Sequence, residues 1–220
     1  MKKKDRFTLI ELLLVIAVIA ILAIGMTMVI ITAGIDLSVG SLIAFSAVLA
    51  TWLIRELAGG ADAASMGMLI CCVCSVAACG LFGLFTGGVV TFFGVPPFVA
   101  TLGMMLVGSG FAYMISDGLS IYQLPNSFDW LGRGADLFGI PNAVILMLLL
   151  YVGAHVLMER TSFGRHVYAV GGNPEAARLS GVPVKRVLLC VYCTCGALAG
   201  LGGVVMASQF LSGDPKYGVM

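Results

Sequence analysis

The sequence predicts an all-α protein, a polytopic bundle of transmembrane helices. Only 10% of its 220 residues are charged, whereas soluble domains average about 25%. Hydrophobic residues make up 60% of the chain and its mean hydropathy is +1.08, which is more apolar surface than one compact soluble globule can bury. The charges are also clustered, with six in residues 2–11 and seven in residues 159–186. We expect these two stretches to lie in water or headgroups and most of the remaining chain to lie in lipid.

A helix needs about 20 apolar residues to cross a bilayer, because no backbone polar group can stay unpaired in hydrocarbon. Six segments meet this requirement, at residues 8–31, 39–57, 64–93, 97–116, 138–158 and 187–212. The third is long enough to extend beyond the bilayer or to bend at Gly87 and Gly88. Small residues four apart, such as Gly196 and Gly200, favour close packing between these helices.

The connection between the first two segments predicts a broken helix near residues 33–41. This stretch reads AGIDLSVGS, which is short and apolar for a loop, and non-helical backbone at membrane depth has to be packed inside protein. An ionisable residue such as Asp36 is a functional candidate in this position. Asp36, Ser38 and Ser41 either line a translocation path or cap the broken helix. We favour the cap, because a carboxylate there satisfies free N–H groups.

Two residues near the start of the fourth segment, Phe98 and Thr101, are further candidates for lining a path. On an apolar helix such residues more often serve packing, so both roles stay open.

The Lys and Arg residues predict the orientation, because they concentrate in cytoplasmic loops. Residues 159–186 hold five of them and are therefore predicted to be cytoplasmic, whereas residues 117–137 hold three Asp against one Arg and are predicted to be outside. Counting back through five crossings places the N-terminus outside. Residues 2–6 include three Lys and one Arg, which favour the inside. We therefore expect that one crossing is missing or that one segment does not cross.

Seven cysteines occur in two clusters inside apolar runs, at residues 71–79 and 190–195. Neither cluster has a His, Asp or Glu within reach in the sequence, so a metal site or a redox role is a poor fit. We expect these cysteines to be small buried residues at helix contacts, and we expect no metal and no other cofactor.

Three motifs follow one another along the chain. Residues 24–41 read IGMTMVIITAGIDLSVGS, residues 94–105 read GVPPFVATLGMM, and residues 161–182 read TSFGRHVYAVGGNPEAARLSGV. Together they resemble the branched permease family that serves bacterial ABC importers for ribose, xylose, galactose and related sugars. The resemblance implies a multi-pass permease subunit of the bacterial inner membrane without enzymatic activity. It also implies three partners: a separate ATPase, a periplasmic or lipoprotein sugar-binding protein, and a second permease subunit in a homo- or heterodimer.

The third motif contains a helix-start signal, because Asn173 can cap a helix, Pro174 suits its first turn and Glu175 favours its positive end. We expect a short amphipathic helix that Gly181 closes. In the family this segment resembles the coupling helix, which implies that it seats in a cleft of the ATPase, with Glu175 and Arg178 as polar contacts. The whole predicted coupling set is Asn173, Pro174, Glu175, Ala176, Ala177, Arg178 and Gly181. The alternative is a solvated loop that only fixes the topology.

The chain departs from the family at both ends. A family member has another transmembrane helix before the first motif and continues past residues 214–218 into further spans. We therefore expect the N-terminal portion of a permease, truncated at both ends, that inserts in the membrane without transporting sugar by itself.

The N-terminal residues resemble a different class of protein. Residues 7–17 read FTLIELLLVIA after a basic leader, which resembles a type IV prepilin N-terminus, although Arg6 stands where prepilins have a glycine. We therefore divide the chain into a leader with a prepilin-like segment, residues 1–23, and a partial permease domain, residues 24–220.

Two other functions remain open at this stage, a pilin-like membrane or assembly protein and an ion-coupled secondary transporter that uses Asp36 as its ion site. Nucleic-acid binding is not expected, because the net charge is only +1 and no basic stripe with interleaved aromatic residues is present. Nucleotide hydrolysis by this chain is not expected either, because the sequence lacks a G-x-x-x-x-G-K-[ST] loop.

Overall fold

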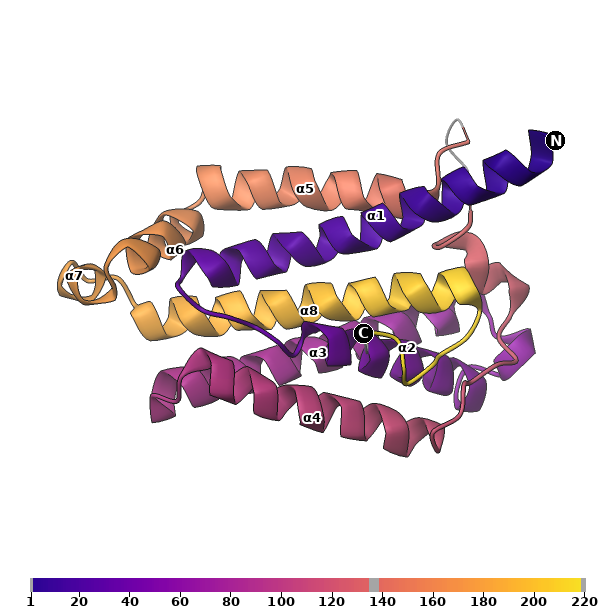
Figure 1. Cartoon of the computed structure of the whole chain (residues 1–220), viewed down its shortest axis with the longest axis horizontal. Coiled ribbons are helices and arrows are strands. Elements are labelled where there is room, and N and C mark those ends of the chain that lie inside the picture. The colour runs from indigo at the N-terminus through magenta and orange to yellow at the C-terminus, as the bar shows by residue number, and fades with distance from the viewer. Residues whose placement is uncertain (1, 135–138, 219–220) are drawn as a thin grey trace.

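The fold is a bundle of long helices (Figure 1). The computed structural model describes residues 2–134 and 139–218. Within these ranges the α-helices are α1 (Lys2–Ile31), α2 (Val39–Glu56), α3 (Ser65–Phe93), α4 (Pro97–Ser116), α5 (Asn142–Arg160), α6 (Ser162–Gly172), α7 (Pro174–Leu179) and α8 (Val184–Phe210). Two short 3-10 helices, η1 (Gly60–Asp62) and η2 (Asn126–Trp130), lie in connections. The β structure of the described residues is one isolated antiparallel bridge between Ile121 and Gly213.

The prediction of six apolar spans is confirmed. Of the described helices, α1, α2, α3, α4, α5 and α8 are long and apolar enough to cross a membrane. The helices begin and end within a few residues of the predicted segments. The exception is α1, which begins earlier, in the polar residues at the start of the chain. Residue 138, where the fifth segment was predicted to begin, lies outside the described residues. Helix α3 continues through Gly87 and Gly88 without a break.

Helix α8 lies at the centre of the bundle and packs against α1, α2 and α3. Glycines make these contacts close: a methyl group on Gly196 or Gly83 would meet the backbone of the facing helix in the α3–α8 pair. On α2, the Ser46 hydroxyl donates a 2.6 Å hydrogen bond to the carbonyl of Gly200 on α8. Small residues at these positions therefore let helix backbones approach each other, as their spacing predicted.

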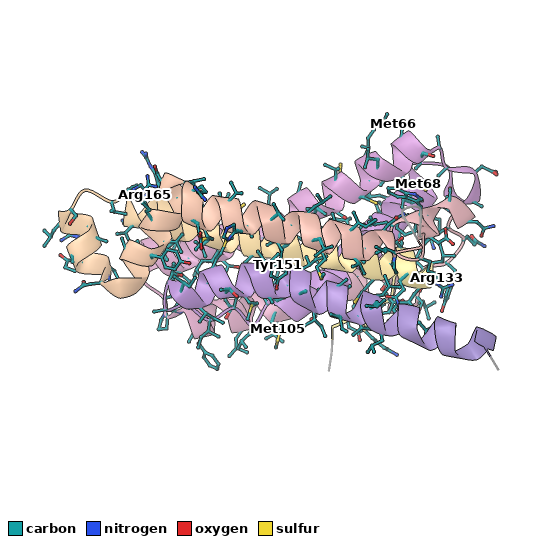
Figure 2. All side chains as sticks on the ribbon, turned by 90° about the horizontal axis from the view of Figure 1, so that it is seen from above. Met66, Met68, Met105, Arg133, Tyr151 and Arg165 are labelled. Atoms are coloured by element: carbon teal, nitrogen blue, oxygen red, sulfur yellow. The ribbon has the colours of Figure 1, made fainter. Side chains whose placement is uncertain are left out.

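The two ends of the bundle carry different parts of the chain. Helices α6 and α7 form one end, whereas the start of α1 and the connection between α4 and α5 lie at the other (Figure 1). Arg165 on α6 and Arg133 in that connection mark the two ends in Figure 2. The N-terminal end of α1 is therefore on the side predicted to be outside, as the count of crossings requires. Its Lys and Arg residues favour the opposite side, so the expectation of a missing or non-crossing segment stays a prediction.

Cysteine burial is only partly as predicted. Cys71, Cys79 and Cys195 are buried, whereas Cys74 and Cys190 are exposed on the outward faces of their helices. All seven are free thiols. A cysteine on a membrane helix can face outward at low cost because its side chain is itself apolar, so an apolar run alone does not predict which face it occupies.

The predicted break between the first two spans is present. Helix α1 ends at Ile31 and α2 begins at Val39, and residues 34–38 between them have no helical structure. This segment runs from the α6 end of the bundle back toward its middle, where α2 starts (Figure 1). The structure therefore contains an extended stretch of backbone inside the length of the bundle.

Candidate functional site

The short helix α7 begins with the predicted cap. The Asn173 side-chain oxygen accepts hydrogen bonds from the backbone N–H groups of Glu175 and Ala176, each 3.0 Å long. Pro174 is the first helical residue. The N–H group at this position has no partner within a helix, so its absence in proline costs no hydrogen bond. A helix of only six residues is marginal alone, so this cap contributes much of its local order.

The other end of α7 is closed by a Schellman motif around Gly181. The Val182 N–H donates to the carbonyl of Ala177, and the Gly181 N–H donates to that of Arg178, each at 3.0 Å. Gly181 has a φ of +84°, a left-handed conformation that glycine adopts without strain. Both ends of α7 are thus fixed by local bonds, and the segment is a defined helix rather than an irregular loop.

An ion pair lies on the exposed surface of α7. Arg178 Nη2 is 2.6 Å from Glu175 Oε1, and Arg178 Nε donates to Glu175 Oε2 at 3.2 Å. Hydrogen bonds from Arg178, followed by its charge, lower the pKa of the Glu175 carboxyl. The same partners raise the pKa of the Arg178 guanidinium. Both groups therefore present fixed charge at the end of the bundle at neutral pH.

The preceding helix α6 was not predicted from the sequence, and it joins α7 to the bundle. Its Val167 and Val170 are fully buried in one apolar core with Val29 of α1 and Tyr192 of α8. Ala177 of α7 belongs to the same core. A two-residue apolar signal, Val167 and Val170 three apart, was present in the sequence but is short for a helix assignment.

Asp36 is bonded within the segment between α1 and α2. It is 2% exposed, and its Oδ1 accepts bonds from the backbone N–H and the hydroxyl of Ser38 at 2.9 and 2.6 Å. The bonded N–H belongs to Ser38, the residue before α2, so Asp36 closes a local turn and accepts no bond from an N–H group within the helix. The Ser41 hydroxyl donates to the Ser38 carbonyl at 2.8 Å. The side chains of Asp36, Ser38 and Ser41 are buried in the protein and bond to atoms of the same short stretch of chain.

The two candidates on α4 occupy different environments. Thr101 is fully buried and its hydroxyl lies 2.9 Å from the carbonyl of Pro97 and 3.4 Å from that of Ile35. Phe98 is exposed. Thr101 thus lies beside the break between α1 and α2, whereas Phe98 faces away from the packed core.

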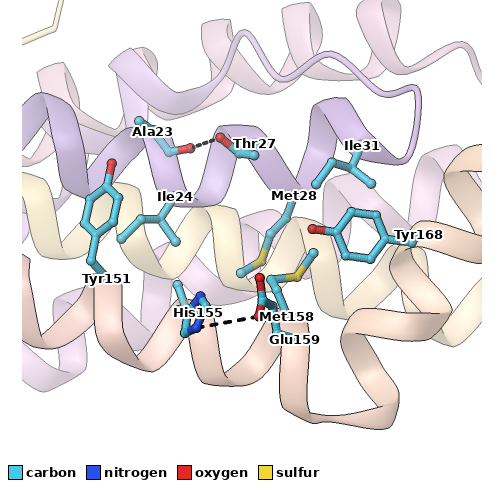
Figure 3. A pocket seen from close by; sticks show the side chains of 11 residues that line it. Ala23, Ile24, Thr27, Met28, Ile31, Tyr151, His155, Met158, Glu159 and Tyr168 are labelled. Atoms are coloured by element: carbon cyan, nitrogen blue, oxygen red, sulfur yellow. Dashed lines mark hydrogen bonds and ion pairs between the residues drawn. The ribbon is translucent and has the colours of Figure 1, made fainter.

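The sequence did not indicate a pocket that lies between α1, α5 and α6 (Figure 3). The cavity has a volume of about 230 Å³. Its polar groups include an imidazole–carboxylate pair on α5, with His155 Nε2 3.6 Å from Glu159 Oε2, and the hydroxyls of Tyr151 and Tyr168. The i,i+4 spacing of His155 and Glu159 is the sequence signal that could have found it. No group of three metal-ligating residues occurs among the described residues.

Comparisons with known proteins identify relatives. Residues 8–220 match the family described as branched-chain amino acid transport system / permease component. The ribose import permease protein RbsC of Escherichia coli K12 is 35% identical over 203 residues, which are 90% of this chain. RbsC of Bacillus subtilis is 38% identical over 216 residues, or 97% of the chain. The L-arabinose ABC transporter permease protein AraH of Azospirillum brasilense is 35% identical over 208 residues, or 94% of the chain.

The chain matches only part of each relative, covering 60%, 64% and 59% of their respective lengths. No solved structure matches the chain. The six apolar helices and the permease relatives make this a multi-pass protein of the bacterial inner membrane. Because the family match extends over nearly the whole sequence, the chain belongs to the family of branched-chain-type transport-system permease components.

Proposed function

We propose that the chain forms part of the permease subunit of an ATP-driven sugar importer. Its spans contribute to the translocation path, and α7 binds a separate ATPase. The observation that carries the proposal is the construction of α7, which is capped at both ends, is anchored through Ala177 and carries the exposed Glu175–Arg178 pair. A solvated loop that only fixed topology would need none of these features.

The substrate class follows from the relatives, which are named for the import of ribose, fructose and L-arabinose. A monosaccharide is therefore the proposed cargo. The proposed partners are an ATPase at the α7 end, a sugar-binding protein at the opposite end and a second permease subunit. In this arrangement the chain performs no chemical step, and the ATPase supplies the energy.

Co-purification of the chain with its cognate ATPase tests the proposal. Replacing both Glu175 and Arg178 by Ala removes the polar contacts of α7, and we expect the affinity to fall about tenfold or more, as for charged contacts at the centre of an interface. Membrane insertion should stay unchanged, because both side chains are exposed.

The matched control is a second exposed ion pair at the opposite end of the bundle. Arg55 Nε is 2.9 Å from Glu56 Oε1 at the end of α2. Replacing these two residues by Ala should leave ATPase binding intact. Equal binding by both double variants and the unsubstituted chain would contradict the assignment of α7 as the ATPase contact.

A further inference from the structure

We propose that the main chain of residues 35–37, between α1 and α2, lines a water-filled part of the sugar path and donates hydrogen bonds to sugar hydroxyl groups. The proposal rests on the proposed function for its substrate class. It differs from a path lined by the side chains of Asp36, Ser38 and Ser41, because it assigns the contact to the backbone.

The segment has one face in the protein and one face outside it. Thr32, Gly34, Asp36 and Ser38 are buried, whereas Ala33, Ile35 and Leu37 between them are exposed. Residues 32 and 33 belong to the turn that ends α1, and from Gly34 to Leu37 the alternation is that of extended backbone, in which successive side chains point to opposite sides. The polar side chains therefore face the interior, and the face left open carries Ile35 and Leu37, which are 50% and 38% exposed.

Part of the backbone of the open segment is unpaired within the described portion of the chain. Among the described residues, no acceptor bonds to the N–H groups of Ile35, Asp36 and Leu37, while the Ser38 N–H is bonded to Asp36. Helix α2 also begins without a side-chain cap. These three N–H groups therefore have no partner among the described residues, and the exposed side chains of Ile35 and Leu37 show that part of the segment borders the outside of the protein.

The neighbours of the segment place it within the bilayer. Thr101 contacts Ile35 four residues into α4, about 6 Å from the start of that helix at a rise of 1.5 Å per residue. A methyl group on Gly34 would meet the Tyr192 hydroxyl, which lies eight residues into α8, or about 12 Å. The hydrocarbon core is about 30 Å thick, so the unpaired N–H groups lie in its cytoplasmic half.

Lipid is a poor environment for these groups. An unsatisfied backbone group in hydrocarbon costs several kcal/mol, and non-helical backbone at this depth occurs where it is covered by protein or borders a water-filled cavity. A sugar suits the second case, because its hydroxyl oxygens accept bonds from N–H groups and its C–H groups can contact Ile35 and Leu37. A cation suits it less well, because the Asp36 carboxylate faces inward and its Oδ1 already accepts two bonds from Ser38.

Thiol accessibility in native membrane vesicles tests the proposal. Ile35→Cys and Leu37→Cys are each treated with a charged, membrane-impermeant methanethiosulfonate, and the unsubstituted chain gives the background from the native cysteines. The matched control is Val152→Cys on α5, which is 63% exposed and lies eight residues, or about 12 Å, from the end of its helix. We expect the two segment variants to react about tenfold faster or more, because the reactive thiolate forms where water reaches the thiol.

Excess D-ribose, D-fructose or L-arabinose is then added, and at least one should slow the reaction at Ile35→Cys and leave that at Val152→Cys unchanged. Equal rates at the segment and at the control would overturn the water-lined segment. If Ile35→Cys and Leu37→Cys do not react with the reagent but form disulfides between two copies of the chain, the water-lined path is overturned and the segment is an interface between permease subunits. Fast reaction that none of the sugars slows would overturn the sugar contact. ATPase co-purification in the same membranes reports on the proposed function separately.

Discussion

Asp36 shows how a buried carboxylate in a membrane segment can serve the fold. Its sequence context predicted either a path residue or a cap, and the structure gives it two short bonds to Ser38. Ionisable residues at membrane depth are functional candidates by default, but this default does not specify the direction of the side chain. That direction depends on the packing of residues 34–38 against α8, which no local pattern encodes.

The bonds of Asp36 predict a difference between two substitutions. Asp36→Asn keeps an oxygen that can accept from Ser38, so we expect a melting temperature in detergent close to that of the unsubstituted chain. Asp36→Leu leaves a buried N–H and hydroxyl unpaired, at a cost of about 1–3 kcal/mol, and should lower it by several degrees. If Asp36→Asn is as destabilising as Asp36→Leu, the negative charge itself is required and the bonds to Ser38 do not account for the role of Asp36.

The Glu175–Arg178 pair predicts how the order of α7 depends on pH. Because Arg178 lowers the pKa of Glu175, the pair stabilises α7 above the ordinary carboxyl pKa of about 4.3 and loses this effect as the pH falls through the lowered pKa. We expect amide exchange in α7, corrected for intrinsic rates, to be constant from neutral pH to about pH 5 and to accelerate only in stronger acid. In Arg178→Ala the pair is absent at every pH, so exchange in α7 should already be faster at neutral pH and should lack the acceleration that loss of the pair causes. Identical profiles would show that the pair does not order α7.

At the scale of elements, hydropathy predicted the six spans because each must bury a full bilayer thickness of backbone. It did not predict α6, whose eleven residues include Arg165, His166 and three glycines. The helix forms because Val167 and Val170 are buried against α1 and α8, a tertiary effect. For the same reason, the pocket beside Tyr168 and His155 became apparent only in three dimensions (Figure 3).

The contact between α6 and α1 predicts a contrast between two neighbouring glycines. A methyl group on Gly171 would meet the carbonyl oxygen of Ile31 at the end of α1, whereas one on Gly172 would meet nothing within 4 Å. Gly171→Ala should therefore destabilise the chain by about 1–3 kcal/mol, and Gly172→Ala should be neutral or slightly stabilising. Thermal unfolding in detergent measures both. Equal melting temperatures would show that α6 does not rest on the end of α1 as described.

At the scale of the whole molecule, the count of crossings and the positions of the helix ends agree, although the basic N-terminal residues favour the opposite side. The division of the chain at residue 23 stays a prediction, as does the prepilin-like resemblance of residues 7–17. Helix α1 is continuous across that boundary, and the family match begins at residue 8. In the proposed function, the assembled protein depends on an ATPase contact at one end and on a path through the bundle.

The central claim, that this chain couples to an ATPase through α7, is tested most directly by ATP hydrolysis. The cognate ATPase is assayed in nanodiscs without the chain, with the unsubstituted chain, and with each double variant of the two exposed ion pairs. We predict that the unsubstituted chain and the Arg55→Ala/Glu56→Ala control change the hydrolysis rate equally, and that Glu175→Ala/Arg178→Ala has a much smaller effect at the same protein concentrations. A rate that is the same with and without the chain, or the same for both double variants, would contradict the claim.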